Sequence, residues 1–389
     1  MPGPAQVVIT RKGESRLESG HLWVYSSDVS DRGRAEAGDV VHVVNQRGRP
    51  LGTALYSSTS QITLRLLSSG RIDSIDDFLL ARLTDALELR RRVVQDSDSY
   101  RLVHADGDLL PALVVDRYGD YLAVQFLNQA TDRLSGQIVR CLKQLIDPKG
   151  IIARNDAAVR RLEGLPSEIQ VIDGELPAGV EVHMNGLTLL ADLAGGQKTG
   201  IYLDQRENYL AAQRHARGRA LDCFTSTGGF ALHLARACES VEGVDSSVHA
   251  LESARANAAV NQLANIDFRE ADVFHLLSGY VTARRSFDVV VIDPPAFAKN
   301  KATVDQAIRG YRDLNLRALK LLGKGGILVT CSCSYHVSEA DLLAVTADAA
   351  LDAGKRLRVL ERRAQAADHP ILLTVPETHY LKCLIFEVL

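Results

Sequence analysis

The second half of the chain repeats one pattern, in which a short apolar, β-branched segment is followed by a stretch with helical spacing. The strands that this pattern predicts are 220–224, 240–244, 266–269, 287–292 and 325–330. Strands that alternate with helices form parallel sheets, so we expect a doubly wound α/β domain from about residue 218 onward. Because ligands bind such sheets at the carboxyl ends of the strands, functional residues are expected there.

The rest of the chain predicts two smaller domains and a closing hairpin. The region 1–70 is β-rich, with short alternating segments at 6–10, 39–45 and 61–67. The region 71–180 has an α/β pattern, with a helix over 71–95, a hairpin over 113–126 and a helix near 132–145. The tail predicts a hairpin of 371–375 with 380–388. The predicted domains are therefore 1–70, 71–180 and 181–389.

Composition excludes some classes of protein and leaves others open. The charges of the 45 basic and 48 acidic residues nearly cancel, so the net charge does not indicate a nucleic-acid partner. The six cysteines show no CxxC pairs and no metal-ligand spacing, so we expect no structural metal. The chain opens without a signal peptide, and no apolar run approaches the roughly 18 residues of a membrane span. We expect a cytoplasmic protein with reduced thiols and no membrane contact.

The ends of the predicted strands carry residues suited to a nucleoside cofactor. Two glycines follow the first strand and let the backbone approach a ligand, but the GxGxxG pattern of dinucleotide folds is absent. An aspartate after a strand is by itself more often a helix cap, yet acids lie at the ends of the first four strands in order. That order favours S-adenosylmethionine, whose cationic groups need acceptors. The predicted cofactor-binding residues are Asp222, Phe224, Gly228, Gly229, Asp245, Ser246, Asp272 and Asp293.

Two further strand ends predict the chemistry. Asp293-Pro294-Pro295-Ala296-Phe297 follows one strand, and Thr330-Cys331-Ser332-Cys333-Ser334 ends the next. A thiolate that adds to carbon 6 of cytosine activates carbon 5 for methylation, and Asp293 is suited to contact the ring nitrogen and the exocyclic amine. Strand alternation places Cys331 and Cys333 on the same face, with Cys333 nearer the opening of the expected binding crevice. Cys333 is therefore the predicted nucleophile and Cys331 a packing residue. Ordinary burial is the alternative reading for both.

The loop that holds Asp293 also offers substrate contacts. Pro294 and Pro295 stiffen the loop around the expected base. Phe297 is placed either to stack on that base or to pack beneath the loop, and the sequence does not decide between the two.

These motifs resemble a known family, the PUA-domain-containing bacterial 23S rRNA cytosine-C5 methyltransferases of the RlmI type. The resemblance covers essentially the whole chain, and its most specific segment runs from Gly196 to Asn208. It implies an N-terminal PUA RNA-binding domain, a class I methyltransferase fold with a mostly parallel seven-stranded sheet, and S-adenosylmethionine as donor. Within the specific segment it adds Gln197 and Lys198 to the cofactor contacts and Arg206 to the substrate contacts.

Three hypotheses follow for function. The first is formation of 5-methylcytosine in 23S rRNA through a covalent adduct with Cys333. The second is methylation of a base nitrogen, because Asp-Pro-Pro-aromatic loops also serve amino groups; here Ala296 separates the prolines from the aromatic ring. The third is an RNA-binding assembly factor whose enzyme site is silent. Trp23, Arg65 and the run Arg90-Arg91-Arg92 are candidate RNA contacts, each more simply read as structural.

Overall fold

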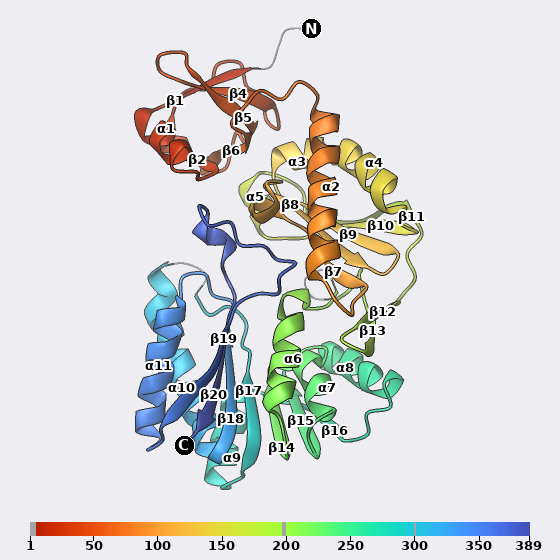
Figure 1. Cartoon of the computed structure of the whole chain (residues 1–389), viewed down its shortest axis with the longest axis vertical. Coiled ribbons are helices and arrows are strands. Elements are labelled where there is room, and N and C mark those ends of the chain that lie inside the picture. Colours follow the sequence, from red (N-terminus) through yellow and green to blue (C-terminus); the bar gives the residue numbers. More distant parts are fainter. Residues whose placement is uncertain (1–4, 197–199, 299–300) are drawn as a thin grey trace. The chain divides into compact units, whose positions relative to one another are not determined.

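A computed structural model of the protein describes residues 5–196, 200–298 and 301–389 (Figure 1). The chain forms two compact units. The first comprises Met1–Val182, Ala191–Gly200 and Ala367–Thr378, and the second comprises His183–Leu190, Ile201–Ala366 and His379–Leu389. The predicted boundaries at 70 and 180 stay predictions, because these units group the chain in a different way.

The first unit begins with a six-stranded sheet of order β2-β6-β5-β4-β1-β3. Its elements are β1 (Gln6–Ile9), α1 (Arg11–Glu18), β2 (Trp23–Tyr25), β3 (Val29–Asp31), β4 (Val40–Asn45), β5 (Pro50–Tyr56) and β6 (Ile62–Ser68). Only the pairing of β1 with β4 is parallel among the pairs of this sheet that the described residues form. The Asn45 side chain accepts from the backbone N–H groups of Arg47 and Arg49 and thereby closes the β4–β5 turn.

A second sheet, of order β11-β10-β9-β8-β7, follows in the same unit. Its elements are α2 (Ile75–Val93), β7 (Ser99–His104), β8 (Leu113–Tyr118), β9 (Tyr121–Phe126), α3 (Gln129–Arg133), α4 (Ser135–Ile146), β10 (Gly150–Asn155), α5 (Val159–Leu162) and β11 (Glu168–Gly174). Helix α2 begins after the Ser74 cap and buries Leu79, Leu83 and Leu87, as its apolar spacing predicts. The predicted hairpin of β8 with β9 is confirmed.

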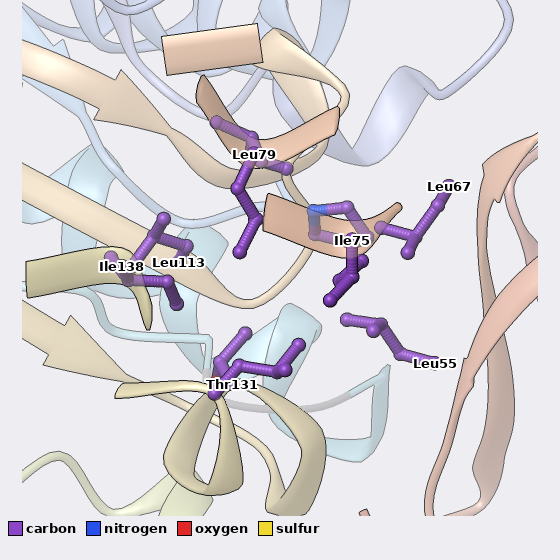
Figure 2. Close-up of a pocket in the computed structure, with 10 residues that line it drawn as sticks. Leu55, Leu67, Ile75, Leu79, Leu113, Thr131 and Ile138 are labelled. Atoms are coloured by element: carbon purple, nitrogen blue, oxygen red, sulfur yellow. The ribbon is translucent and has the colours of Figure 1, made fainter. Parts of the chain in front are cut away.

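Apolar side chains of α2 pack against both sheets of this unit. Figure 2 shows Ile75 and Leu79 beside Leu55, Leu67 and the residues of the second sheet and its helices. The cavity among them is about 10 Å³, which is close to the least volume that holds one water molecule. The contact between α2 and the two sheets is therefore packed core, and this cavity is too small for a ligand.

The second unit holds the predicted doubly wound sheet. Its elements are α6 (Arg206–His215), β14 (Arg219–Cys223), α7 (Gly229–Ala235), β15 (Ser240–Asp245), α8 (Val248–Val260), β16 (Ile266–Glu270), α9 (Val273–Thr282), β17 (Phe287–Ile292), α10 (Val304–Leu321), β18 (Leu322–Ser332), α11 (Glu339–Asp352), β19 (Leu357–Arg363) and β20 (Lys382–Val388). The short strands β12 (Val180–Met184) and β13 (Leu187–Ala191) form a separate two-stranded sheet.

Strand order in this unit fixes where a ligand can bind. The seven strands run β16-β15-β14-β17-β18-β20-β19, and the first five are parallel while β20 is antiparallel to both of its neighbours. The predicted mostly parallel seven-stranded sheet is thus confirmed. The order reverses between β14 and β17, and such a switch point opens a crevice at the carboxyl ends of the strands. Asp222, Asp293 and Cys333 all come from this edge.

The predicted closing hairpin is wrong in one of its two segments. Residues 371–375 form no strand, and β20 pairs instead with β18 and β19. Pro370 and Pro376 flank the segment and remove backbone donors that a strand would need. Leu372 and Val375 pack into the apolar core of the N-terminal sheet. The apolar run therefore reflects packing of a loop.

Candidate active site

The turn between β14 and α7 is held in an uncommon backbone conformation. Phe224 and Ser226 have φ values of 65° and 49°, and Gly228, which precedes α7, has 91°. Residues other than glycine rarely adopt positive φ, and such strain clusters at ligand sites. Successive changes of backbone handedness turn N–H groups toward one side of the loop. The loop is thus shaped to present its backbone at the switch point of the sheet.

Gly229 allows α6 to lie close against this turn. A Cβ atom at Gly229 would lie 2.4 Å from the ring of Tyr209, which is buried on α6 and stacks edge-on against Phe230. We predict that Gly229→Ala lowers the free energy of unfolding by about 1–3 kcal/mol through overpacking. Urea unfolding measures this change. Gly279→Ala is the matched control, because nothing lies within 4 Å of its added methyl group and α9 gains helix propensity; equal effects of the two variants would contradict the packing argument.

Asp222 lies at the base of the turn and is almost wholly buried. Its Oδ2 accepts from the Thr225 hydroxyl at 2.6 Å and from the Ala231 N–H at 2.9 Å, whereas its Oδ1 has no hydrogen-bond partner among the residues that the structure describes. Burial raises the pKa of Asp222 to about 7, and the negative charge of Asp293 adds to the rise. A buried acceptor without a partner is costly. The Asp222 carboxyl group therefore favours a ligand that brings a hydrogen-bond donor or a positive charge.

Asp245 holds the same turn from the next strand. Its Oδ2 accepts from the Ser226 N–H and its Oδ1 from the Ser247 N–H, each at 2.9 Å. Both oxygens retain further acceptor capacity for ribose hydroxyls. Ser246 is exposed beside it, and Ser247 caps α8. Asp245 thus stabilises the loop in addition to its predicted cofactor contact.

Asp272 is the N-cap of α9 and accepts from the His275 N–H at 2.8 Å. This is the structural role that an aspartate after a strand most often has. Its side chain is 57% exposed, so it remains accessible to a ligand at this edge of the sheet.

The loop after β17 is tied to β14, to the segment that follows β18 and to Gln205, which directly precedes α6. The Asp293 N–H donates to the Cys223 carbonyl of β14 at 3.4 Å, and the Gln205 side-chain amide donates to Asp293 Oδ2 at 3.0 Å. Further along the loop, the Ala298 N–H donates to the Ser334 hydroxyl at 3.2 Å. Pro294 is buried and Pro295 is exposed. The Asp293 carboxylate is therefore fixed at the switch point.

Phe297 packs beneath the loop. Its ring lies 5.0 Å from that of Tyr311 on α10 and 6.2 Å from that of Phe274 on α9, and it is partly buried in the core. Phe297 also lines a pocket of about 470 Å³ together with Phe274, Gln306, Ala307, Arg309, Gly310 and Asp313. The packing role is thus present, and stacking on a base stays a prediction.

Cys333 lies directly after β18 and is half-buried, whereas Cys331 is fully buried. The Cys333 Sγ lies 4.0 Å from the Pro294 carbonyl oxygen, next to Asp293. Cys331 instead faces Cys383 across the β18–β20 pair, and burial raises the pKa of the Cys331 thiol. The structure thus brings the predicted nucleophile to the Asp293 loop and places the other cysteine in the core.

A hydroxyl network supports Cys333 from the side of α10. Tyr311 donates to Ser332 at 2.9 Å and lies 3.3 Å from the hydroxyl of Ser334, the two serines that flank Cys333. Burial raises the pKa of Tyr311 to about 12, so it stays a hydrogen-bond donor at neutral pH. The roles of Tyr311 and Gln205 were not predicted from the sequence, because each residue reaches the site from a distant part of the chain.

Several other predicted site residues lie elsewhere or are buried. Arg206 begins α6 with only 2% exposure. Gln197 and Lys198 lie outside the described residues. Among the candidate RNA contacts, Arg65 is buried against Glu163 at 3.3 Å, and Arg90 is buried against Asp108. Trp23 is half-buried and its indole N–H donates to Asp106 at 3.0 Å. The structural reading holds for these three side chains.

Two classes of feature are absent from the described residues. In those residues no group of three or more His, Cys, Asp or Glu side chains is arranged to hold a metal ion. No helix among them is both long enough and apolar enough to cross a membrane.

Two family descriptions match parts of the chain. Residues 7–69 match a PUA-like domain and residues 214–365 match a methyltransferase domain. Among solved structures, a candidate methyltransferase complexed with SAH has a TM-score of 0.86 at 20% identity and covers 99% of this chain and 100% of its own. A candidate SAM-dependent methyltransferase from Streptococcus mutans has a TM-score of 0.84 at 19% identity, with the same coverage. These likenesses confirm the predicted fold.

Full-length relatives identify the family. "Ribosomal RNA large subunit methyltransferase I" of Tolumonas auensis is 40% identical over 393 residues, which cover 98% of this chain and 99% of the relative. The protein of the same name from Shewanella denitrificans is 41% identical over 386 residues, with 96% and 97% covered. The chain belongs to the ribosomal RNA large subunit methyltransferase I family.

Proposed function

We propose that this protein forms 5-methylcytosine in 23S rRNA through a covalent adduct between Cys333 and carbon 6 of the target base, with S-adenosylmethionine as the methyl donor. The observation that carries the proposal is the position of the half-buried Cys333 thiol, 4.0 Å from the carbonyl oxygen of Pro294, the residue that directly follows Asp293. The proposal that the RNA is ribosomal rests on the family.

The residues at the switch point fit the donor. The partnerless Oδ1 of Asp222 lies in a site where Asp293 and Asp245 add negative charge, and S-adenosylmethionine carries a sulfonium and an ammonium group. Asp222, Asp245 and Asp272 would accept from its amino group, ribose and base, while Phe224, Gly228 and Gly229 let the backbone approach it. When bound, the donor supplies an electrophilic methyl group.

The residues of the loop and of β18 would act on the cytosine ring. The Cys333 thiolate forms a bond to carbon 6, and the electron pair of the 5,6 double bond becomes available at carbon 5. Asp293 contacts the ring nitrogen and the exocyclic amine; in its carboxylic acid form it donates a proton to the ring nitrogen when sulfur adds, and it takes that proton back when the adduct breaks down. After carbon 5 is methylated, a base removes its proton and the Cys333–carbon 6 bond breaks, which regenerates the thiolate. Ala296 and Phe297 occupy the place where many related enzymes carry a second cysteine, so Cys333 serves both halves of the cycle.

The donor site gives a prediction for Asp222 with a defined pH dependence. Because the pKa of Asp222 is about 7 instead of about 4, the carboxyl group is largely protonated at pH 6 and largely ionised at pH 8. A cationic ligand binds the ionised form more tightly, so affinity for S-adenosylmethionine is expected to rise from pH 6 to pH 8. Asp222→Asn is expected to weaken binding at pH 8 by about 10- to 100-fold and to remove this rise.

Isothermal titration calorimetry at pH 6, 7 and 8 measures this effect. Thr225→Val is a useful companion variant, because it removes one hydrogen bond that lowers the pKa of Asp222 and should move the rise in affinity to higher pH. Equal affinities of wild type and Asp222→Asn at pH 8 would show that this carboxylate does not hold the donor.

The product of the reaction tests the proposal as a whole. Nucleosides of 23S rRNA from a strain that lacks this protein are compared by mass spectrometry with those of the parent strain. We expect one 5-methylcytidine to be lost and to return when the gene is restored. Loss of an N-methylated base instead would favour amino-group methylation, and an unchanged nucleoside set would favour a binding role without chemistry.

A further inference from the structure

A buried lysine lies beside the predicted nucleophile. Lys382 is the first residue of β20 and pairs with Ser332, the last residue of β18. It is 3% exposed, whereas lysine is almost never fully buried unless it is paired. Its Nζ donates to the Ser334 carbonyl oxygen at 2.7 Å and to the Tyr380 carbonyl oxygen at 2.9 Å. One of the three ammonium protons remains for another acceptor.

The charge of Lys382 is not neutralised by a carboxylate. In the part of the chain that the structure describes, no acidic side chain lies within ion-pair distance of its ammonium group. Burial lowers the pKa of Lys382 to about 8, while the negative charges of Cys333 and, next, Asp341 act in the opposite direction. Asp341 itself is engaged at the start of α11, where its Oδ2 accepts from the Ser338 N–H and hydroxyl. Burial of an ammonium group without a counter-ion costs free energy of folding. An anion that forms only during the reaction would offset this cost.

The hydrogen bonds of Lys382 also fix the backbone around Cys333. The Ser334 carbonyl belongs to the residue that directly follows Cys333. On the other side of that backbone, the Tyr311 hydroxyl binds Ser332. The main chain of Cys333 is therefore held from β20 and from α10, which limits the directions in which its thiol can point.

We propose that Lys382 is a positioning residue that acts through Cys333: its ammonium group stabilises the Cys333 thiolate and its hydrogen bond to Ser334 aims the thiol at the Asp293 loop. This inference rests on the proposed role of Cys333 as nucleophile. A nearby cation lowers the pKa of a thiol and so raises its thiolate fraction at neutral pH. The step in the cycle that benefits is the addition of sulfur to carbon 6, in which the thiolate must be formed before the base is attacked.

Other titratable groups of this part of the site lie on the elements around Cys333 and Lys382. They are Asp293 after β17, Tyr311 on α10, Asp341 on α11, Cys331 on β18 and Cys383 on β20. The two carboxylates oppose formation of the thiolate when they are ionised, whereas burial raises the pKa of Tyr311 and of the Cys331 thiol and so keeps both neutral at pH 7. Lys382 supplies the opposite charge.

The pH dependence of alkylation tests the proposal without RNA or cofactor. The full-length protein is treated with iodoacetamide between pH 5 and 10, and modification of Cys333 is followed by peptide mass spectrometry. We expect Lys382→Met and Lys382→Gln to raise the apparent pKa of the Cys333 thiol by about one unit, so that its thiolate fraction at pH 7 falls about ten-fold. Lys382→Arg, which keeps the charge, should retain most of the effect.

Lys355→Met is the matched control. The Lys355 ammonium group also donates to two backbone carbonyls, of Leu319 and Leu322, and burial lowers its pKa, but it lies at the opposite end of β18. This variant should leave the pKa of the Cys333 thiol unchanged. A Cys333 pKa that is also unchanged in folded Lys382→Met or Lys382→Gln would overturn the proposal.

A reciprocal measurement keeps the test decisive if the lysine variants do not fold. Because coupling between two sites is reciprocal, Cys333→Ala should lower the pKa of Lys382. NMR of ¹³C-labelled lysine side chains, with Lys382 assigned from Lys382→Arg, reports this pKa, and no change would contradict the coupling. If Cys333→Ala still methylated RNA, the proposed covalent mechanism would be wrong, but the coupling between Lys382 and Cys333 would be unaffected. Failure of the proposed function can therefore be told apart from failure of the coupling.

Discussion

Replacing Cys333 by alanine is expected to lower the rate of methyl transfer to RNA by about 10⁴-fold or more, since removal of a nucleophile abolishes the covalent route. Binding of S-adenosylmethionine should stay within about two-fold of wild type, because Cys333 is not among the predicted donor contacts. The measurement is single-turnover formation of methylated RNA with saturating cofactor, combined with calorimetry for cofactor binding.

Cys331→Ala is the control for this variant, because it makes the same chemical change two residues earlier, within β18. Cys331 is fully buried and faces Cys383, so its truncation should cost about 1 kcal/mol of stability and little activity. A trapped complex provides a second readout, since RNA that carries 5-fluorocytosine cannot lose a proton from carbon 5 and should stay attached to wild type. Full activity of Cys333→Ala would exclude the covalent mechanism.

The doubly wound sheet was predictable because its central strands are buried on both faces. Val289, Val290, Val291 and Ile292 are all fully buried, and such runs read as continuous apolar segments. The predicted and observed bounds of β17 coincide, and those of β14 differ by one residue at each end. The N-terminal sheet was harder, since β2 and β3 have three residues each and carry too little periodicity to identify.

The tail shows why an apolar run does not determine its own partner. Residues 371–375 and β20 are both apolar and lie close in sequence, which favours a hairpin. In the structure Leu372 and Val375 complete the core of the N-terminal sheet, a contact across more than 300 residues of chain. Local pattern contains no information about such a contact.

The site was predictable where topology brings residues together and unpredictable where a distant side chain joins them. Asp222, Asp245, Asp293 and Cys333 follow from the rule that ligands bind at the carboxyl ends of parallel strands. Gln205 reaches Asp293 from 88 residues away. Lys382 reaches the Ser334 carbonyl from 48 residues away. A lysine at the start of a strand is ordinarily exposed to solvent, so the burial of Lys382 is seen only in the folded structure.

Asp293→Asn is expected to reduce kcat by about 10²- to 10⁴-fold, the usual contribution of a positioned acid or base. Asparagine has nearly the same shape and keeps contact with the ring, but it cannot supply the proton that the cytosine takes up when sulfur adds to carbon 6. KM for RNA should therefore change much less than kcat. The measurement is the rate of methyl transfer at saturating RNA and cofactor, together with cofactor affinity.

The matched control for this variant lies on the same strand. Asp288→Asn changes a carboxylate at the amino end of β17, where Asp288 accepts from the Arg219 N–H at 2.8 Å, far along the strand from the switch point. Its kcat should equal that of wild type. Gln205→Leu removes the donor that orients Asp293 and should give an intermediate loss, because the carboxylate remains but is less well aimed. If Asp293→Asn kept a kcat within two-fold of wild type while Cys333→Ala was inactive, ring protonation would have to come from another group, since the thiol alone does not activate cytosine.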